Sequence, residues 1–464
     1  MTVTVSLRGN DLLLVPADTS ELDRLPPDVR AALRFDARLK GYRALPLHLP
    51  AIEAALGETA AFTFTARPPL PFTPRLQGTP RPYQEAALAA WQTAGGRGVV
   101  VLPTGAGKTF VALMAIAALR LCTLVVVPTL DLLAQWRQAL RDGLAAPPEV
   151  VGGVGGGVRG QWPLTVITYD SALRHPRLLT RFGLLVADEV HHLPAPAYRR
   201  IAEAAIAPFR LGLSATPERA DGLHADLTAL IGPEVYRREP HELARTGHIA
   251  PYEERRVEVA LLREERARYE AHTRAYRAYL AARGLRVRSG QDFERYVLRR
   301  SGSDPAAYQA LRAHQEARRI AFGARSKVQV VEELLERHRD ERVLIFSEYN
   351  DVVRELGRRL CIPVIVHDTP PAERRAILEK FRAGLYTKLA TGRVLNEGVD
   401  VPDAAVAIVV SGSGTRREHV QRVGRVLRPK AGRAVLYELV TRDTSEPRVA
   451  RRRRAPVTSD TGET

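Results

Sequence analysis

The spacing of hydrophobic residues changes along this chain, and the changes divide it into blocks of different structure. From Val99 onward, short β-branched runs alternate with amphipathic helical segments; the runs are VVVLP, TLVVVPT, TVITY, LLVADE and RLGLSAT. Such alternation predicts a parallel sheet with helices on both faces. From about 257 to 325 the strand pattern stops and helical stretches rich in Arg and Tyr follow, before strands return in VLIFS, PVIV, KLAT and AVAIVV. The pattern predicts an α/β fold with two parallel sheets and a helical insertion.

A separate block precedes this pattern. Residues 1–75 contain short apolar runs and one or two helical stretches, which predict a small α+β domain. The stretch RPPLPFTPRLQGTPRP that follows has the proline-rich composition of a linker. We therefore expect domains at 1–75, 79–245 and 246–464, with the helical insertion at about 257–325 in the last of them.

Charge and composition narrow the class of partner. The formal net charge is +17, and a chain this basic attracts polyanions such as nucleic acid. A general bias toward arginine is the alternative, since only six of the 69 basic residues are lysines. No run of about 18 apolar residues and no basic-then-apolar leader occurs, so we expect neither a membrane span nor secretion. The expected location is the cytoplasm, with the nucleoid, or the nucleus.

The sequence LPTGAGKT at 102–109 is the strongest sign of chemistry. It follows an apolar strand and precedes the helical run FVALMAIAALR. A close turn around phosphate needs residues without Cβ, which Gly105 and Gly107 supply, and Lys108 and Thr109 suit the β- and γ-phosphates and Mg²⁺. The predicted nucleotide-contacting residues of this P-loop are Thr104, Gly105, Ala106, Gly107, Lys108 and Thr109.

A P-loop requires a carboxylate at the end of a neighbouring strand, and LLVADEVHH provides two. Asp188 is the candidate for the Mg²⁺ shell and Glu189 the candidate base for the attacking water. The alternative is that both residues cap the following helix. The pair His191–His192 lacks a third ligand at suitable spacing, so we do not expect a zinc site. The glycine-rich piece VGGVGGGVRG at 151–160 lacks a strand–loop–helix context and predicts a flexible surface turn.

The sequence DEVHHLPA and its flanking motifs resemble superfamily 2 helicases, most closely the xeroderma pigmentosum group B (XPB) branch in its short archaeal-type form. The resemblance covers nearly the whole chain and implies two RecA-like P-loop domains. RPYQ at 81–84 resembles the adenine-reading motif, which implies base contacts by Arg81 and Gln84. VVPTLDLLAQW and TYDS resemble segments that contact nucleic-acid backbone, the latter through Tyr169. LSATPERADG resembles the motif that couples hydrolysis to movement, through Ser214 and Thr216.

The second half carries matching motifs. GRVLNEGVDVPDA resembles the motif that places Asp400 near the ribose, and SGSGTRREHVQRVGRVLRP resembles the family's last motif. The resemblance implies that Gln421, Arg425 and Arg428 serve the nucleotide, with both guanidinium groups reaching the γ-phosphate. An arginine supplied by one domain would then neutralise charge bound by the other.

One departure bears on strand separation. Family members carry an Arg-Glu-Asp triplet after the coupling motif, which helps open duplex, whereas this chain reads Arg219-Ala220-Asp221. ATP hydrolysis should be unaffected, but duplex opening is put in doubt. Tyr269, Tyr276 and Tyr279 in the insertion are candidates for stacking on bases, although packing in the insertion's own core is favoured.

The resemblance implies ATP and Mg²⁺ as cofactors, DNA as substrate, 3′-to-5′ polarity and work in DNA repair. It also implies a damage-recognition-like role for residues 1–75. Three functions stay open: a helicase that separates strands, a duplex translocase that does not, and an ATP-switched DNA-binding platform that recruits a nuclease. Partners of either kind, a nuclease or a repair and transcription-factor complex, are implied by the resemblance alone.

Overall fold

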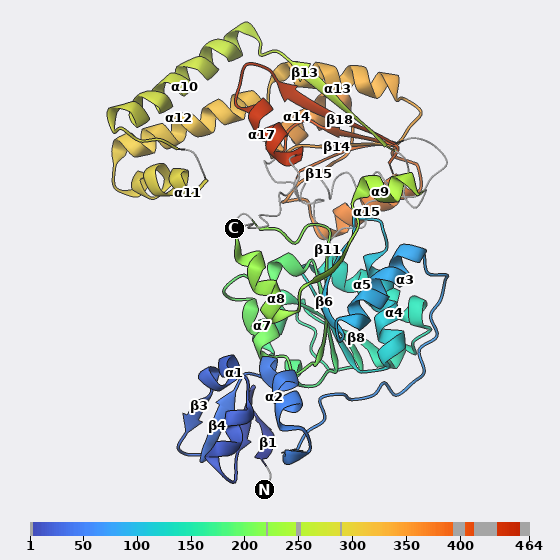
Figure 1. Ribbon diagram of the computed structural model, residues 1–464. Coiled ribbons are helices and arrows are strands. Elements are labelled where there is room, and N and C mark those ends of the chain that lie inside the picture. The colour runs from blue at the N-terminus through green and yellow to red at the C-terminus, as the bar shows by residue number, and fades with distance from the viewer. Residues whose placement is uncertain are drawn as a thin grey trace. The chain divides into compact units, whose positions relative to one another are not determined.

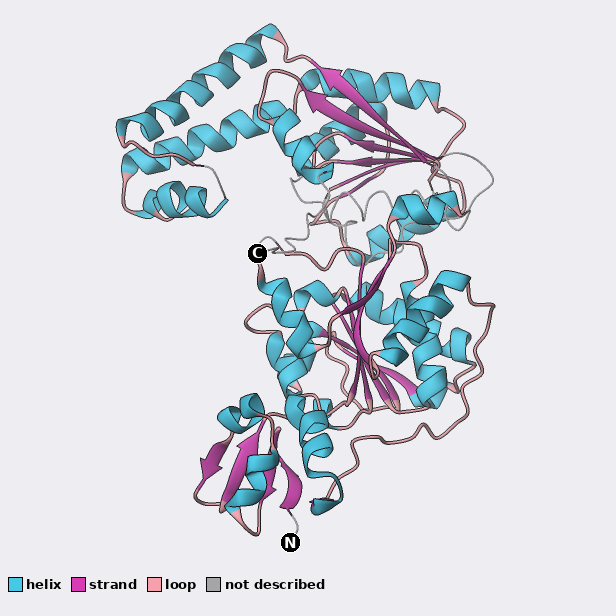
Figure 2. Ribbon diagram, viewed as in Figure 1, coloured by secondary structure: helices cyan, strands magenta, loops and turns pink. Residues whose placement is uncertain are grey.

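The computed structural model describes residues 3–219, 221–246, 252–287, 290–392, 404–412 and 434–454. The chain divides into two compact units, the first with the described residues up to Leu243 and the second with those from Ala244. Each is an α/β body built on its own sheet (Figure 1, Figure 2), which confirms the predicted fold class. No helix within the described ranges is long and apolar enough to cross a bilayer.

The first unit begins with a small mixed sheet of strand order β3-β4-β2-β1-β5. A hairpin of β1 and β2 forms its centre, and β5 runs parallel to β1. Short helices bury their apolar residues on this sheet. The elements are β1 Val3–Arg8, β2 Asp11–Val15, η1 Thr19–Arg24, α1 Pro27–Ala32, β3 Arg34–Asp36, β4 Gly41–Ala44, η2 Pro46–His48, α2 Leu49–Leu56, η3 Gly57–Thr59 and β5 Ala60–Phe62.

This small domain shares its core with the rest of the unit. Ile206 belongs to the N-terminal hydrophobic cluster, and Leu47 packs against the cluster of the larger sheet. The proline-rich segment is also fixed, because Leu70 N–H donates to the Arg120 carbonyl and Gln77 N–H to the Gly143 carbonyl, both at 2.8 Å. Composition predicted a linker, but backbone hydrogen bonds hold this stretch along the larger domain.

A seven-stranded parallel sheet of order β12-β6-β11-β10-β7-β9-β8 forms the centre of the first unit. Its inner strands are apolar along their whole length because helices cover both faces. Helices α3, α4 and α5 lie on one face and α6, α7 and α8 on the other (Figure 1). The strands are β6 Arg97–Val101, β7 Thr123–Val127, β8 Val151–Val154, β9 Leu164–Thr168, β10 Leu184–Asp188, β11 Phe209–Ser214 and β12 Glu234–Arg237. The helices are α3 Pro82–Thr93, α4 Lys108–Leu119, α5 Leu130–Leu144, α6 Tyr169–Arg174, α7 Arg199–Ala204 and α8 Leu227–Leu230.

The glycine-rich piece at 151–160 differs from expectation. Its first half is the edge strand β8, and only residues 155–158 form a tight turn, closed by a bridge between Gly155 and Val158. A Cβ on Gly152 would lie 1.8 Å from the Trp162 ring, and one on Gly153 2.6 Å from Leu133. Glycine is therefore needed here for close packing of side chains on the strand, which composition alone does not distinguish from flexibility.

The second unit contains a six-stranded parallel sheet among its described residues, in the order β13-β18-β17-β14-β16-β15. Its strands are β13 Tyr252–Val259, β14 Val343–Phe346, β15 Val364–Ile365, β16 Lys388–Thr391, β17 Val406–Val409 and β18 Ala434–Thr441. The helices are α9 Pro240–Arg245, which spans the division between the units, α13 Arg325–Arg337, α14 Asn350–Leu360, α15 Pro371–Arg382 and α17 Glu446–Arg454. Strand β13 reaches Val259, past the predicted start of the insertion at 257, because its alternating charges conceal an edge strand.

Helices make up the insertion that follows β13. α10 Arg263–Ala282 lies beside α12 Pro305–Phe322 (Figure 1), and the short α11 Gly290–Phe293 closes the group. Tyr279 is buried, its hydroxyl donates to the Tyr296 carbonyl at 3.1 Å, and Tyr276 packs against the same cluster. Tyr269 packs against a second small cluster. The tyrosines thus contribute to the insertion's own packing, the favoured interpretation.

A buried ion pair joins distant parts of the second unit. Lys327 and Glu446 are fully buried, and Lys327 Nζ lies 2.8 Å from both carboxylate oxygens. The ammonium group also donates to the Val410 carbonyl at 2.7 Å, and Glu446 accepts from Thr441 N–H at 2.8 Å. Charges taken out of water persist only when paired and hydrogen-bonded, so this contact fixes α13, β17 and α17 together.

Lys327→Met should lower the free energy of unfolding by about 3–5 kcal/mol, because it leaves the Glu446 charge buried and unpaired. The double variant Lys327→Met, Glu446→Leu should recover part of this loss, since no charge then remains. Urea unfolding followed by circular dichroism measures both values. A double variant no more stable than the single one would contradict the ion-pair explanation.

The His314 imidazole should stay neutral at pH values well below the usual pKa of histidine. It lies between Tyr276 and Phe293, with ring centroids at 4.7 and 4.8 Å, and burial, with Arg318 nearby, lowers its pKa to about 4. Because the unfolded chain protonates His314 near pH 6.5 and the folded chain does not, stability should fall as pH drops from about 6.5 to 4. An NMR titration of the imidazole gives the pKa directly, and His314→Phe should remove that part of the pH dependence. An unshifted titration near 6.5 would contradict the burial.

Candidate active site

The P-loop connects β6 to α4 and has the backbone of an anion cradle. Gly105 and Gly107 adopt φ values of 83° and 78°, in the left-handed region that side chains disfavour, and Gly107 starts the helix. Lys108, the first helical residue, donates from Nζ to the Leu102 carbonyl at 3.2 Å. Backbone N–H groups and a helix N-terminus are thus gathered around one ammonium group, the arrangement that suits a bound phosphate.

The residues of the RPYQ motif hold this loop from behind. Gln84 is buried and its amide donates to the carbonyls of Ala106 and Gly107, at 3.2 and 3.3 Å, while its oxygen accepts from Arg81 N–H. The Tyr83 hydroxyl donates to the Ala106 carbonyl at 2.6 Å and accepts from Arg81 Nη1 at 3.1 Å. Gly107 must be a glycine for a second reason, because a Cβ there would lie 2.4 Å from Gln84 Nε2. The motif therefore shapes the P-loop itself.

Asp188 ends β10 two strands away from β6, at the edge of the sheet from which the P-loop emerges. The side chain is buried, and Trp136 Nε1 donates to its Oδ2 at 2.8 Å while Glu189 N–H donates to its Oδ1 at 3.0 Å. Burial raises the pKa of this carboxyl, and the indole N–H and the Lys108 charge oppose that rise. The indole fixes the carboxylate in one orientation, as outer-shell donors do at metal sites.

Glu189 has a backbone conformation that costs energy. Its φ of 45° lies in the left-handed region, and such strain in a non-glycine residue persists only where the surroundings impose it. Its Oε2 lies 3.5 Å from Nδ1 of the fully buried His191. The same imidazole nitrogen lies 3.3 Å from the Ser214 hydroxyl. The turn thereby directs the Glu189 carboxylate toward the end of the neighbouring strand β11.

The coupling motif continues this network. Ser214 is fully buried and its hydroxyl accepts from Thr216 N–H at 3.1 Å. Beyond it, Arg219 donates from Nη1 to the His191 carbonyl at 2.7 Å and binds the Asp221 carboxylate through Nε and Nη2, at 2.9 and 2.5 Å. That bidentate contact holds the pKa of Asp221 at about 2. A continuous set of polar contacts therefore runs from Glu189 to Asp221.

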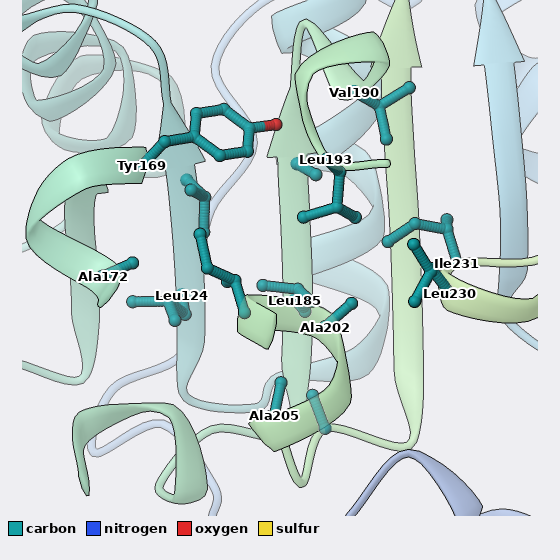
Figure 3. Close-up of a cluster of buried hydrophobic side chains, with 14 of the residues drawn as sticks. Leu124, Tyr169, Ala172, Leu185, Val190, Leu193, Ala202, Ala205, Leu230 and Ile231 are labelled. Atoms are coloured by element: carbon teal, nitrogen blue, oxygen red, sulfur yellow. The ribbon is translucent and has the colours of Figure 1, made fainter. Parts of the chain in front are cut away.

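Tyr169 differs from its expected role. It is buried in the main core cluster (Figure 3), its hydroxyl donates to the Asp188 carbonyl at 3.1 Å, and its ring lies against His192 and Tyr198. Its side chain supports the end of β10 and is not available to a nucleic-acid backbone. A tyrosine on the first turn of a short helix points inward here because α6 and α7 both cover the same face of the sheet.

The cradle fits a nucleotide triphosphate and a divalent ion. The hydroxyls of Thr104 and Thr216 are buried without a hydrogen-bond partner among the described residues, and such groups ordinarily have one. Both belong to loops that follow neighbouring strands at the same edge, β6 and β11. Thr109 follows Lys108 on the first turn of α4. Oxygen ligands from Thr109 and Asp188 are the type that Mg²⁺ prefers.

Four predicted site residues lie outside the described residues: Asp400, Gln421, Arg425 and Arg428. The described part of the second unit leads up to the last motif at Ser411. Its hydroxyl accepts from Glu348 N–H at 3.0 Å and lies 2.9 Å from the Ser347 hydroxyl, so the ends of β14 and β17 are joined.

Three residues at this site escaped the sequence analysis: Tyr83, Trp136 and His191. Trp136 lies in a segment read only as a nucleic-acid contact, and His191 in a pair considered only for metal. The only signal in the sequence was that each of these residues lies within a motif, and each motif was assigned another role. Each residue has a partner on another strand or loop, and spacing along the chain does not reveal it.

Trp136→Phe should raise the Mg²⁺ concentration needed for half-maximal ATP hydrolysis by about 10-fold or more, because Asp188 loses the donor that orients it. Trp91→Phe is the matched control: Trp91 is equally buried and its Nε1 donates to the Arg210 carbonyl at 2.9 Å, away from the cradle. The control should lower stability and leave the metal requirement unchanged. Equal metal dependence in the two variants would contradict the orienting role.

Comparisons with known proteins agree with this geometry. Residues 77–219 match the family described as type III restriction enzyme, res subunit, and residues 306–461 match the ERCC3/RAD25/XPB C-terminal helicase family. The helicase domain of Hef from Pyrococcus furiosus has a similar fold, with a TM-score of 0.52 and 20% identity over 80% of this chain and 97% of that one.

Three relatives that match 80–84% of this chain have XPB in their names. The DNA 3′-5′ translocase XPB2 of Sulfurisphaera tokodaii is 42% identical over 375 residues, which are 81% of this chain and 84% of that protein. The DNA 3′-5′ helicase XPB of Mycobacterium tuberculosis is 35% identical over 80% of this chain, and the fission-yeast factor IIH subunit XPB is 29% identical over 84%. The matches span 62% and 47% of those two longer proteins. The identity and coverage of the Sulfurisphaera relative, together with the two family matches, establish that this chain belongs to the XPB family of superfamily 2 DNA helicases and translocases.

Proposed function

We propose that this protein is an ATP-dependent DNA 3′-5′ helicase or translocase that works in DNA repair. The observation that carries the proposal is the contact path from Glu189 through His191 to Ser214 and Arg219. These contacts connect the candidate catalytic carboxylate to the end of a neighbouring strand, which offers a route from hydrolysis to other elements. Family membership supplies DNA as the track and the polarity.

Hydrolysis is assigned to the residues around the cradle. Lys108 and the N–H groups of the P-loop bind the phosphates, and Mg²⁺, held by Thr109 and Asp188, would neutralise developing charge when bound. Glu189 orients the attacking water and accepts its proton. Thr104 and Thr216, whose buried hydroxyls have no hydrogen-bond partner within the described ranges, offer further hydrogen bonds to the phosphates or the water.

Coupling follows from the position of His191. When Glu189 gains a proton, the charge that faces Nδ1 of His191 disappears, and the hydrogen bond shared with Ser214 must readjust. Arg219 is bonded to the carbonyl of the same histidine, so the readjustment reaches the Arg219–Asp221 pair. Ser214, Thr216 and Arg219 are therefore proposed as coupling residues.

Residues of the second lobe are also assigned to the nucleotide in this proposal. Arg425 and Arg428, with Gln421, are assigned to the γ-phosphate and Asp400 to the ribose, on the strength of the motifs they belong to. Arg81 and Gln84 are assigned to the adenine, and the hydrogen bonds of Gln84 to the P-loop support a role in sensing the nucleotide.

Translocation on duplex DNA without strand separation is the second candidate. The Arg219 guanidinium is committed to Asp221 and to the His191 carbonyl, and the glutamate that relatives carry between these positions is alanine here. Because the Arg219 guanidinium already binds groups of its own domain, fewer of its N–H donors are available to a duplex junction. The Sulfurisphaera relative is itself named a translocase.

Protein partners remain part of the proposal. The fission-yeast relative is named as a subunit of a transcription and DNA repair factor, which supports an assembly of that type. A nuclease partner, the third function considered, is supported only by the family resemblance. Work on DNA locates the protein at the nucleoid or in the nucleus.

Lys108→Ala and Glu189→Gln should each reduce DNA-stimulated ATP hydrolysis by at least about 100-fold, because each removes a group that acts in the transition state. DNA affinity, measured by fluorescence anisotropy, should change little. Lys380→Ala is the control, because it removes an exposed ammonium group from α15. Normal turnover in either cradle variant would refute the site assignment.

A second experiment separates the candidate functions. ATP hydrolysis is measured with single-stranded, duplex and forked DNA and with RNA, beside displacement of a labelled strand. Stimulation with displacement supports a helicase, duplex stimulation without displacement supports a translocase, and no stimulation by any of these nucleic acids leaves only the recruiting platform. Stimulation by RNA alone would overturn DNA as the track.

A further inference from the structure

A basic groove lies at the edge of the seven-stranded sheet, beyond β8. It has a volume of about 450 Å³ and is bounded by residues 159–161, which follow the β8 turn, and by residues 174–181, which include η5 Pro176–Thr180. Arg159, Arg174, Arg177 and Arg181 line it together with His175. Val154 and Leu178 supply an apolar floor. We call this feature the edge groove.

The charge of the edge groove is uncompensated. No lining residue is acidic, and none of the four arginines forms an ion pair with any described residue. Some other guanidinium groups of this arginine-rich unit are paired with carboxylates, as Arg199 is with Glu203 and Arg237 with Glu218. Arg174 Nε donates to the Asp170 carbonyl at 3.2 Å, but no carboxylate neutralises the four guanidinium groups. Positive charges around one hollow repel each other, and a bound polyanion would relieve that repulsion.

Tight local packing fixes the walls. A Cβ on Gly160 would lie 2.2 Å from Trp162, whose ring also covers Gly152, so the segment carrying Arg159 is held close to β8. On the other wall, Arg174 ends α6, Arg177 lies on η5 and Arg181 follows η5, and all three line the groove. The positions of the charges therefore follow from rigid elements.

The edge groove is separate from the nucleotide site. Strands β11, β10, β7 and β9 lie between β6, which carries the P-loop, and β8. At about 4.8 Å per strand, the two features are about 24 Å apart across the sheet. A triphosphate in the P-loop cannot reach these arginines, so the cradle does not account for them.

We propose that the edge groove binds the phosphate backbone of DNA, as a contact additional to those of the helicase motifs. This inference rests on the proposed function, since it assumes that the protein acts on DNA. A phosphodiester backbone presents only acceptor oxygens, and the guanidinium groups that dominate the groove present only donors. An acidic peptide fits less well, because each of its residues also brings an N–H donor that needs an acceptor. The contact carries no sequence information and extends the footprint along a DNA arm.

The test reverses two of the four charges. The double variant Arg177→Glu, Arg181→Glu is compared with Arg75→Glu, Arg200→Glu, which changes the charge equally at exposed arginines of the same unit outside the groove. Affinity for a labelled forked duplex is measured over a range of salt concentrations. Each phosphate contact contributes about 0.9 to the slope of log K against log salt, so the groove variant should lose about 2 from that slope. The control should keep the wild-type slope, and circular dichroism should show both variants folded.

A groove variant with the slope and affinity of the control would overturn the proposal. Calorimetry with inorganic phosphate forms a second arm: saturable binding that is lost in the groove variant, without a change in the DNA slope, would assign the groove to a small anion and equally overturn it. Failure of the proposed function is distinguishable, because the wild-type protein would then show no DNA-stimulated ATP hydrolysis at all. If the groove variant loses salt dependence while the wild-type protein shows DNA-stimulated ATP hydrolysis, the result supports both the groove contact and the proposed function.

Discussion

The structure around the cradle depends on one constraint: the Asp188 carboxylate that ends β10 is buried, the Glu189 carboxylate beside it is mostly buried, and both must be held by polar partners. Asp188 has Trp136 and a backbone N–H, and Glu189 adopts a left-handed backbone that turns its carboxylate toward His191. Burial makes each of these contacts strong and makes any loss costly. The partners belong to α5, η6 Val190–His192 and β11. A change of charge at Asp188 or Glu189 therefore alters contacts in three elements.

The same principle appears away from the chemistry. Arg210 on β11 is fully buried, with four N–H···O bonds to the carbonyls of Ala202, Ala205, Ala207 and Leu230. Three of these carbonyls lie at the C-terminal ends of α7 and α8, where a positive charge is favoured by the helix dipoles. Burial lowers the pKa of this guanidinium well below its usual value, yet its donors are satisfied. In the second unit, Lys327 and Glu446 fix α17 and β17 in the same manner. Both units thus rely on buried charge with complete partners to hold helices in position on a sheet, which gives a motor rigid bodies to move.

Contacts with DNA make different demands. A translocating protein must bind and release its track repeatedly, so its phosphate contacts have to be exposed and individually weak. The edge groove has those properties: its arginines lie at the surface, on walls fixed by glycine and tryptophan packing. The buried coupling path and the exposed basic groove are therefore complementary parts of one activity, the first stiff and the second adaptable.

The sequence by itself determined the α/β class, the parallel sheets and the helical insertion, because apolar periodicity reports burial directly. It also indicated the cradle, since glycines before a lysine are demanded by local backbone geometry. Only the tertiary structure decided which side chains serve that cradle. Tyr83, Trp136 and His191 act through partners on other strands and loops, and Tyr169 packs into the core beneath two helices that share a face. The glycine-rich edge strand was misinterpreted because Trp162 and Leu133 pack against its glycines and leave no room for a Cβ. The local sequence pattern reports the burial and backbone conformation of each residue. Contacts between elements depend on the topology of the sheet, which no single segment encodes.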